Sequence, residues 1–519
     1  MNWLDRAALS ISPRWGLARL RARAAARHFE SAASGRRTDN WSRRGTDANA
    51  AASGATLAIL RAQARDLIRN NPYAKRGARR IVTNIVGWGL RPTAAGRSAA
   101  KITELWKKWG ETTECDADGR LTFYGIQRQV MTTIVEAGEV LVRRRGRRPA
   151  DGLAIPMQLQ VLEPDFLDSS RDRIMGQQGG PVVQGVEFDT IGRRVAYWLF
   201  DEHPGSSSFS TPTSHRVPAD GVLHVFPQER PGQVRGPSWF APVDVRLHDF
   251  DEYEDATLMR QKIAACFAAF VTDVDGAGPG LGEASTDAGQ PLVETLEPGL
   301  ISRLPPGKTV SFANPPAADD HASFSTTALR GVAVGLGTTY EDLTGDYSQV
   351  NFASARMGRI AHYGDVHDWR WNMLVPLLCA PAWTWILEAA ALAGLIEDDP
   401  QPAEWTPPPM PMIDPEKEGL ALSRLVRAGA KTFDEMVREQ GYDPEEFAAE
   451  YAKGMKRLDK YGIVLDSDAR RVSAAGLAQP APKDAAAAQQ PDGAVPASIP
   501  TDGGKAGGKV NGKAAPGGT

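Results

Sequence analysis

The sequence predicts an α+β protein that is predominantly helical, and three observations support this class. Apolar residues recur about every 3.6 residues along most of the chain between residues 56 and 465. Between residues 140 and 226 the apolar residues instead alternate with polar ones, as in half-buried strands. The 519 residues are enough for a sizeable core and roughly two to four domains. We therefore expect a helical protein that contains a smaller β region.

Four helices are expected in the first part of the chain. The first covers 56–70 and ends before Pro72, because a residue that precedes proline avoids helical backbone angles. The second covers 73–86. The pattern predicts two more helices at 99–109 and 122–136.

The β region follows these helices. The run 159–168 reads as one strand, and 185–200 reads as a hairpin that turns near Gly192. Another short strand is expected at 222–226. His215 and His224 lie at or near these strands without a Cys or acid at metal-ligand spacing, so we interpret both as structural.

The second half of the chain returns to the helical period. Its expected elements are a long helix at 241–271 with an acidic first half, two extended pieces at 293–303 and 308–313, a helix near 320–335, a long helix at 352–396 and a helical unit at 415–465.

A polar loop at 337–351 separates two of these helices. It carries Glu341, Asp342 and Asp346 but no Lys or Arg. It also lacks a nucleophile with its base, a metal cluster and a phosphate-binding Gly-Lys turn. This composition is more typical of a surface over which something passes than of a catalytic pocket.

The charge distribution excludes a globally basic nucleic-acid binder, since the formal net charge is −3. Residues 14–44 and 61–80 are Arg-rich, whereas 244–255 and 341–346 are acidic. The basic residues of 61–80 either contact phosphate or form a charged outer face. The three cysteines, Cys115, Cys266 and Cys379, are too widely spaced for a disulfide framework or a zinc site.

A search for catalytic and metal-binding motifs predicts no catalytic residue, cofactor or metal. The best metal candidate is the run HYGDVHD, with His362, Asp365, His367 and Asp368. Residues five apart on a helix diverge by about 140°, so both histidines do not share a face. The acids of 244–255 leave open an alternative, a nucleic-acid-processing enzyme.

Three segments need an interpretation of their own. Residues 373–396 are long enough to cross a bilayer, but Pro376, Pro381 and Glu388 favour a buried helix and no membrane span. Residues 1–52 form a basic arm without a secretory signal, which we expect to be partly disordered, and 471–519 form a disordered tail.

Several runs of the chain resemble the portal proteins of lambda-like tailed bacteriophages. They occur in the family's order and together cover about 55–400. These runs are NNPYAKRGARRIVTNIVGWGLRP (70–92), EAGEVLVRR (136–144), LQVLEPDFLD (159–168), GVEFDTIGRRVAYWLF (185–200), RVPADGVLHVFPQERPGQVRGPSWFAPV (216–243), FANPP (312–316) and LTGDYSQVNFASARMGR (343–359).

The resemblance implies a structural, non-enzymatic protein. It implies a homo-oligomeric ring of about twelve subunits at a capsid vertex. Double-stranded DNA would pass through the ring without sequence preference. The implied partners are the terminase large subunit, capsid and scaffold proteins, and head-completion or tail proteins. The implied location is the virion, after assembly in the bacterial host cytoplasm.

The resemblance also divides the chain into wing, stem, clip and crown parts. The implied parts are the wing at 53–240, the stem helix at 241–271, the clip at 272–317, the second stem helix at 318–336, the tunnel loop at 337–351, the long wing helix at 352–400 and the helical crown at 414–470.

Three groups of site residues follow from this division. The tunnel loop contributes Glu341, Asp342, Asp346, Tyr347 and Gln349. The channel face of the stem contributes Asp244, Asp251 and Asp255. A terminase contact is expected at Pro305, Pro306, Gly307 and Lys308.

Overall fold

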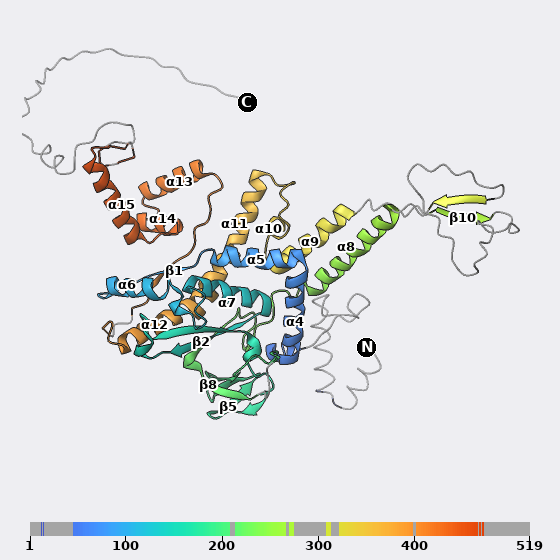
Figure 1. Cartoon of the computed structure of the whole chain (residues 1–519), viewed down its shortest axis with the longest axis horizontal. Helices are drawn as coiled ribbons and strands as arrows, with labels where there is room; N and C mark the ends of the chain where they lie inside the picture. The colour runs from blue at the N-terminus through green and yellow to red at the C-terminus, as the bar shows by residue number, and fades with distance from the viewer. Residues whose placement is uncertain are drawn as a thin grey trace, which may run out of the picture. The chain divides into compact units, whose positions relative to one another are not determined.

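The computed structural model describes residues 45–207, 213–265, 269–273, 308–312, 321–397 and 401–465, and a few single positions beside them. The chain divides into two compact units, residues 1–441 and 442–519. Figure 1 labels helices and strands by the names used below. Most of the expected arm, clip and tail lies outside the described residues, as do Cys266 and the extended piece expected at 293–303.

The first unit begins with a short helix, α3 (Ala48–Ala51), and two longer helices, α4 (Gly54–Asn70) and α5 (Pro72–Val86). Asn71 separates the two longer helices, and its side-chain oxygen accepts hydrogen bonds from the backbone N–H groups of Tyr73 and Ala74. This cap satisfies two of the N–H groups that the start of a helix leaves free. Both helices were predicted, to within about two residues.

The main core forms where α6 (Ala99–Trp109) and α7 (Phe123–Ala137) pack against other helices. Trp106 lies at its centre, with its ring centroid 5.0 Å from that of Phe123 and 5.5 Å from that of Trp383. A two-stranded sheet of β1 (Arg91–Thr93) and β12 (Glu404–Thr406) closes one side and contributes Trp405 to the same core.

Two antiparallel sheets make up the β region. The expected hairpin at 185–200 and the strand at 222–226 are present, but the run expected as one strand at 159–168 is a strand only to Leu162, and Pro164–Phe166 form a short 3-10 helix. One sheet has the order β3-β2-β9, with β2 at Val140–Gly146, β3 at Met157–Leu162 and β9 at Val222–Val225. The other has the order β4-β5-β6-β7-β8, with β4 at Ile174–Met175, β5 at Gly179–Val183, β6 at Val186–Asp189, β7 at Arg194–Phe200 and β8 at Ser214–Pro218. Leu141, Val186 and Leu199 belong to a second core cluster shared by the two sheets.

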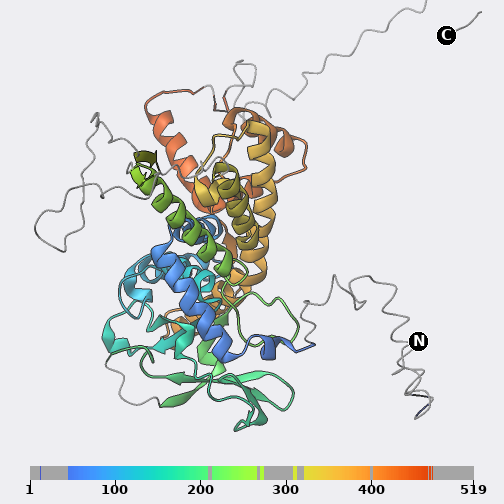
Figure 2. The same ribbon diagram turned by 90° about the vertical axis from the view of Figure 1, so that its right-hand side faces the viewer.

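Helix α8 (Asp244–Ala265) is shorter than the helix expected at 241–271. Residues Ala269–Asp273 form the strand β10, which pairs in antiparallel register with β11 (Lys308–Phe312). The alanines near the end of α8 are compatible with a helix, but this pairing places the following residues in a strand instead. Helix α9 (His321–Leu336) confirms the expected second helix, and it packs beside α8 (Figure 2).

The long helix expected at 352–396 is divided into three parts. These are α11 (Phe352–Trp369), the π-helical segment Arg370–Cys379 and α12 (Ala380–Leu392). Pro376 lies inside the π-helical segment, where its ring and missing N–H disturb the regular hydrogen bonds. The whole run is long and apolar enough to cross a membrane, but 61% of its most apolar window is buried inside the protein.

Arg370, the first residue of the π-helical segment, fixes the end of α5. Its guanidinium donates to the backbone carbonyls of Ile85, at 2.6 Å, and Asn84, at 2.7 Å. These carbonyls belong to the last turn of α5 and have no partner within that helix. Burial lowers the pKa of Arg370 to about 10, so the guanidinium keeps its charge at neutral pH.

The helical unit expected at 415–465 is divided by the boundary between the two compact units. Helices α13 (Pro415–Arg427) and α14 (Phe433–Glu439) belong to the first unit. Helix α15 (Pro444–Lys460) belongs to the second, where the rings of Phe447 and Tyr451 stack with centroids 6.2 Å apart.

A buried network of charged side chains, which we call the Glu139 network, joins the α4 helix to the β region. Glu139 is fully buried, and both of its carboxylate oxygens accept from Arg235 Nε. Its Oε2 also lies 2.9 Å from His224 Nε2, and Arg61 Nη1 lies 3.7 Å from Oε1. The residues Arg61 and His224 are therefore internal, which agrees with the structural role predicted for His224.

Candidate functional site

The segment between α9 and α11 is more ordered than the polar loop that the sequence predicts. Gly337, with φ of 67°, ends α9 in the left-handed region that glycine adopts without strain. A short helix, α10 (Tyr340–Thr344), follows and is capped by the Thr339 side chain. Gly345, with φ of 77°, ends α10, and Asn351 caps α11. The exposed loop is thus reduced to about 345–351.

Asp342 anchors this segment to α5 and does not project from it. Its Oδ1 accepts from Arg80 Nη2 at 2.6 Å and Nε at 3.0 Å, and its Oδ2 accepts from Asn84 Nδ2 at 2.9 Å. The Asp342 backbone carbonyl accepts from Arg76 Nε at 3.0 Å. Only 16% of the Asp342 side chain is exposed. Arg80 and Asn84 therefore hold the Asp342 carboxylate within the protomer, and the expectation that Asp342 faces the channel stays a prediction.

His362 extends this anchor to α11. Its Nε2 lies 3.0 Å from Asn84 Nδ2, whose other hydrogen bond goes to Asp342. Because the amide nitrogen of Asn84 only donates, His362 Nε2 is the acceptor and the ring is neutral. Burial lowers the pKa of His362, against the attraction of Asp342 and Asp365, which agrees with that state. His362 is therefore used in packing, whereas His367 and Asp368 of the same metal candidate are exposed.

The other predicted loop residues lie at the surface. Asp346, Tyr347 and Gln349 are exposed, and Tyr347 is 58% exposed. A hydrogen bond from the Ser348 backbone N–H to Asp346 lowers the pKa of that carboxyl. Glu341 is half-buried and helps to line a cavity of about 540 Å³ between α5, the loop and α11.

Helices α8 and α9 are joined through small residues. A side chain at Gly335 would clash with Val243, and one at Gly331 would meet Arg246, so both glycines permit the close approach. Farther along, the ring of Tyr253 lies 4.4 Å from that of Phe324, centroid to centroid. The two glycines of α9 therefore allow α8 to pack closely against the helix that leads into the candidate loop.

The three predicted stem acids differ in their surroundings. Asp251, Asp255 and Asp244 recur at spacings of four and seven residues, which places them along one stripe of α8. Asp251 and Asp255 are exposed. Asp244 is only 6% exposed, and neither carboxylate oxygen has a hydrogen-bond partner among the described residues. Burial raises its pKa to about 6, so the expectation that Asp244 lies on an open face is wrong for the protomer.

The predicted terminase contact is almost entirely outside the described residues. Pro305, Pro306 and Gly307 lie there, and Lys308 is the first residue of β11, paired with Asp273 of β10.

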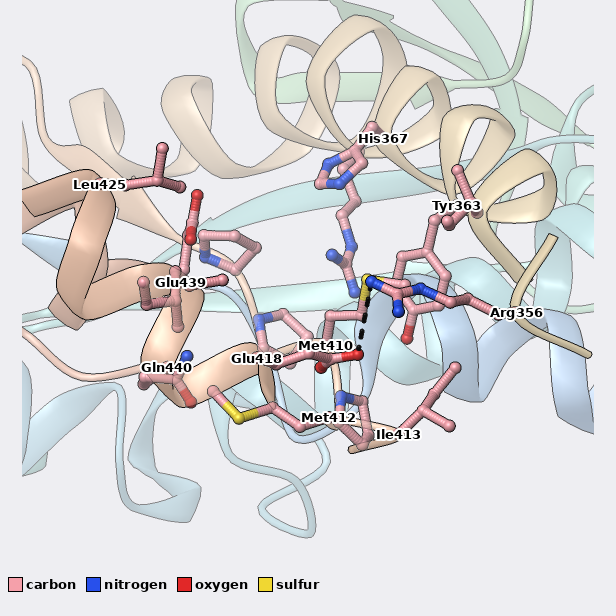
Figure 3. A pocket seen from close by; sticks show the side chains of 17 residues that line it. Arg356, Tyr363, His367, Met410, Met412, Ile413, Glu418, Leu425, Glu439 and Gln440 are labelled. Carbon is pink, nitrogen blue, oxygen red and sulfur yellow. Dashed lines mark ion pairs between the residues drawn. The ribbon is translucent and has the colours of Figure 1, made fainter. Parts of the chain in front are cut away.

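An apolar groove of about 410 Å³ lies between α11, the segment 407–413 and α13 (Figure 3). Tyr363, Met410 and Met412 line it, and an ion pair between Arg356 and Glu418 crosses one end (Figure 3). Most of the exposed lining is apolar, and charged side chains such as Arg356, Glu418 and Glu439 also contribute to it.

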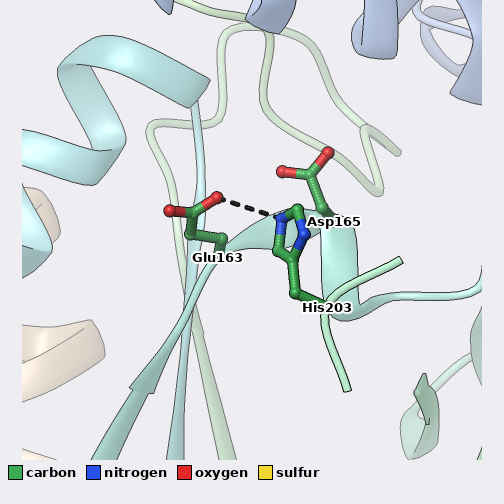
Figure 4. A group of neighbouring side chains, drawn as sticks. All are labelled: Glu163, Asp165 and His203. Atoms are coloured by element: carbon green, nitrogen blue, oxygen red, sulfur yellow. Dashed lines mark ion pairs between the residues drawn. The ribbon is translucent and has the colours of Figure 1, made fainter. Parts of the chain in front are cut away.

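One acid–histidine group among the described residues has the spacing of a metal site. Glu163, Asp165 and His203 point toward one another from neighbouring segments (Figure 4). Arg65 Nη2 lies 2.6 Å from Glu163 and 2.7 Å from Asp165, and Arg61 Nε lies 3.4 Å from Asp165. Because these two arginines already balance the carboxylates, the group does not require a cation.

Arg80 and Asn84 are the functional residues that sequence reasoning missed. Arg80 belongs to the basic run 61–80, for which phosphate contact and a charged outer face were the two interpretations. Neither interpretation is correct for Arg80, since its partner is Asp342, 262 residues away. The sequence contained one signal for this contact. Asp342 lies in a segment without Lys or Arg, so a cation that pairs with it has to come from another part of the chain.

Comparison with known proteins supplies the class of this chain. Residues 34–370 match the family described as "Phage portal protein, lambda family". The chain is 29% identical over 431 residues to the probable portal protein of Halomonas phage phiHAP-1, a match that covers 78% of this chain and 81% of the relative. It is 23% identical over 448 residues to the portal protein of Escherichia phage N15, covering 76% and 84%.

Among solved structures, the chain is similar to one described as the neck of a native GTA particle computed with C12 symmetry. That match has a TM-score of 0.45 and 15% identity, and covers 76% of this chain and 95% of the other.

The class is thus that of phage portal proteins. This chain belongs to the lambda family of these proteins. It is a structural component of the portal at the capsid vertex of a bacteriophage particle, with an α+β, predominantly helical fold.

Proposed function

We propose that copies of this chain assemble into a ring of about twelve subunits, through which double-stranded DNA passes during packaging and ejection. The loop 345–351 and the exposed acids of α8, Asp251 and Asp255, would line the channel. The proposed partners are the terminase large subunit, which docks near 305–308, capsid and scaffold proteins, and head-completion or tail proteins. Assembly would occur in the bacterial host cytoplasm.

The geometry of the loop is the observation that carries this proposal. Asp342 holds the base of the segment on α5, while Asp346, Tyr347 and Gln349 remain exposed beyond it. The stretch 337–351 has no Lys or Arg. A lining rich in cations would bind phosphate by releasing counterions and would hold the DNA in place. A firmly based loop with an acidic and polar tip can instead touch DNA while the DNA slides.

The channel assignment is tested by reversing the charge of two acids of the segment 337–351, the half-buried Glu341 and the exposed Asp346. We expect the double variant Glu341→Lys/Asp346→Lys to form rings normally but to package DNA several-fold more slowly, because each subunit then presents two cations to the phosphates. Ring formation is measured by light scattering and negative-stain microscopy, and packaging by nuclease-protected DNA. Asp342 is left unchanged, since its substitution would also release the loop.

A control variant, Asp118→Lys/Glu202→Lys, introduces the same change in charge at two exposed positions of the first unit that lie outside this segment. We expect it to package DNA at the rate of the unmodified protein. Equal slowing in both variants would show that net charge alone matters and would remove the loop from the channel.

The enzyme alternative has no support among the described residues. Asp244 is buried away from the exposed Asp251 and Asp255, and the acids of α8 do not form a group with metal-ligand spacing there. Incubation of the purified protein with DNA and Mg²⁺ is expected to give no cleavage. Cleavage that is lost in Asp251→Asn would instead support a nuclease.

A further inference from the structure

The strand β2 carries an arginine-rich surface that the proposed channel does not use. The strand (Val140–Gly146) and the two residues that follow it read VLVRRRGRR. We call the side chains of Arg143, Arg145 and Arg147, together with Gln158 and Gln160 of the neighbouring strand β3, the β2 patch. Arg143 and Arg145 are cross-strand partners of Gln160 and Gln158 in the register of the two strands. Paired residues of this kind project on the same face of a sheet.

Along the strand, this face changes from buried apolar residues to partly exposed arginines. At its covered end Leu141 pairs with Leu162, and both are buried in the second core cluster. Two residues farther on, the same face presents Arg143 and then Arg145. The arginines are therefore located where the sheet extends beyond the layer that covers it, and their guanidinium groups remain partly accessible.

The arginines of the patch have no carboxylate partner within 4 Å in the part of the chain that the structure describes. Arg147 Nε donates to Gln158 Oε1 at 2.7 Å, which is a neutral contact. The nearby Asp201 attracts Arg143, but its carboxylate lies 2.9 Å from His215. Burial, followed by repulsion from Arg145, lowers the pKa of Arg143, which shows that the two cations lie close together.

Arg144, on the opposite face, provides a contrast. Its Nη1 lies 2.7 Å from Glu388 and its guanidinium packs over the ring of Trp385, both on α12. The arginine that faces the protein thus has an acidic partner, whereas those that face outward do not. Neighbouring cations without carboxylate partners create a local positive potential, which attracts an external anion.

We infer that the β2 patch binds the phosphodiester backbone of double-stranded DNA as a holding contact, outside the sliding path. Alternate residues of a strand are about 6.8 Å apart, so the arginines form a linear row of cations suited to a regularly charged polymer. Arginine binds phosphate in a bidentate manner, and the glutamines can contact phosphate or sugar without reading bases. The patch has no apolar centre, which a protein partner would require. The inference uses neither the ring nor the channel.

The test measures binding of the full-length protein to short DNA duplexes of two unrelated sequences, by fluorescence anisotropy at increasing salt. The variant is Arg143→Gln/Arg145→Gln/Arg147→Gln. Each lost phosphate contact should reduce the slope of log affinity against log salt by about 0.9, so we expect a slope shallower by about 2.7 per bound subunit. At low salt the affinity should fall at least tenfold for both sequences.

Two further variants separate this contact from other effects. A matched control, Arg97→Gln/Lys101→Gln/Arg120→Gln, removes three exposed cations elsewhere and is expected to change the affinity less than twofold. The variant Arg143→Lys/Arg145→Lys/Arg147→Lys keeps the charges and is expected to retain most of the slope, which guards against a general folding defect.

Three results would overturn the inference. An equal loss of DNA affinity in the patch variant and in the matched control would show that the effect comes from net charge alone. An unchanged salt slope in a folded patch variant would show that DNA does not contact these arginines. If the patch variant binds DNA normally but fails to form rings, the anion that contacts these arginines is an acidic protein surface. None of these results depends on whether DNA also passes through the ring.

Discussion

Glu139 and Asp244 are both buried carboxylates, but their surroundings give them opposite properties. Burial opposes the charge of Glu139, yet Arg235 and His224 outweigh it and hold its pKa far below the usual range. Asp244, at the start of α8, has no hydrogen-bond partner among the described residues, and burial alone raises its pKa to about 6.

The difference shows that burial does not decide the charge of an acid; its partners do. Asp342, at the base of the candidate loop, has one cation and one amide as side-chain partners, and 16% of its side chain is exposed. The Glu139 network stabilises the contact between α4 and the β region, the Asp342 contacts hold the candidate loop on α5, and Asp244 makes the start of α8 sensitive to pH.

The largest effect is expected from Arg235→Met. This change leaves Glu139 buried without its main cation, and breaking a buried pair from one side costs about 3–5 kcal/mol of the free energy of unfolding. Chemical denaturation measures the loss. Arg120→Met, at an exposed position, serves as the control and should change the free energy by about 0.5 kcal/mol or less. A loss below about 1 kcal/mol for Arg235→Met would contradict the central role given to this pair.

The next effect concerns Asp244 and depends on pH. The folded protein keeps the Asp244 proton up to about pH 6, whereas the unfolded chain releases it near pH 3.8, the ordinary pKa of an aspartate side chain. Stability therefore decreases as the pH rises from about 4 to 6, by roughly 2–3 kcal/mol for this group. Asp244→Asn should match the unmodified protein near pH 4 and exceed it above pH 6. A difference that does not vary with pH would show that Asp244 is not buried in solution.

A smaller effect is expected at the loop anchor. Arg80→Gln and Asp342→Asn should each cost about 1–2 kcal/mol, because the pair is charge-assisted but partly exposed. The double variant should cost little more than either single change, and a double-mutant cycle measures this coupling. Hydrogen exchange should accelerate in 340–350 but not in α7. Additive losses would mean that the two side chains act separately.

The smallest effect on stability is expected from Asp346→Asn. The side chain is exposed, and its contacts lie within its own loop, so the free energy of unfolding should change by about 0.5 kcal/mol or less. Thermal unfolding compared with that of Asp342→Asn provides the measurement. A loss as large as that of Asp342→Asn would show that the two loop acids do not differ as described.

The sequence predicted elements whose signals are local. The helices α4 and α5 follow from their apolar period and from the Asn71-Pro72 boundary between them, and the hairpin near Gly192 follows from strand alternation and a turn residue. The class of protein came from the family resemblance, since no local spacing of residues indicates a portal.

The remaining features depend on contacts between distant residues. The strand β10 exists because it pairs with β11, although its own sequence is compatible with the end of a helix. Arg80 and Asp342 meet across 262 residues, and burial of Asp244 arises from the packing of α8, which an acidic sequence does not indicate. Periodicity describes one element at a time and contains no information about such partners.

The π-helical segment Arg370–Cys379 has a consequence for how the chain tolerates changes in length. Each of its hydrogen bonds spans one residue more than those of an α-helix, so its turns are wider than those of α11 and α12. If one residue is deleted here, a π-helical turn can become an α-helical turn. Helices α11 and α12 then keep the orientations of their faces, which carry His362 and Trp383. We therefore expect insertions and deletions of single residues among relatives to concentrate in this segment, between the loop and the core.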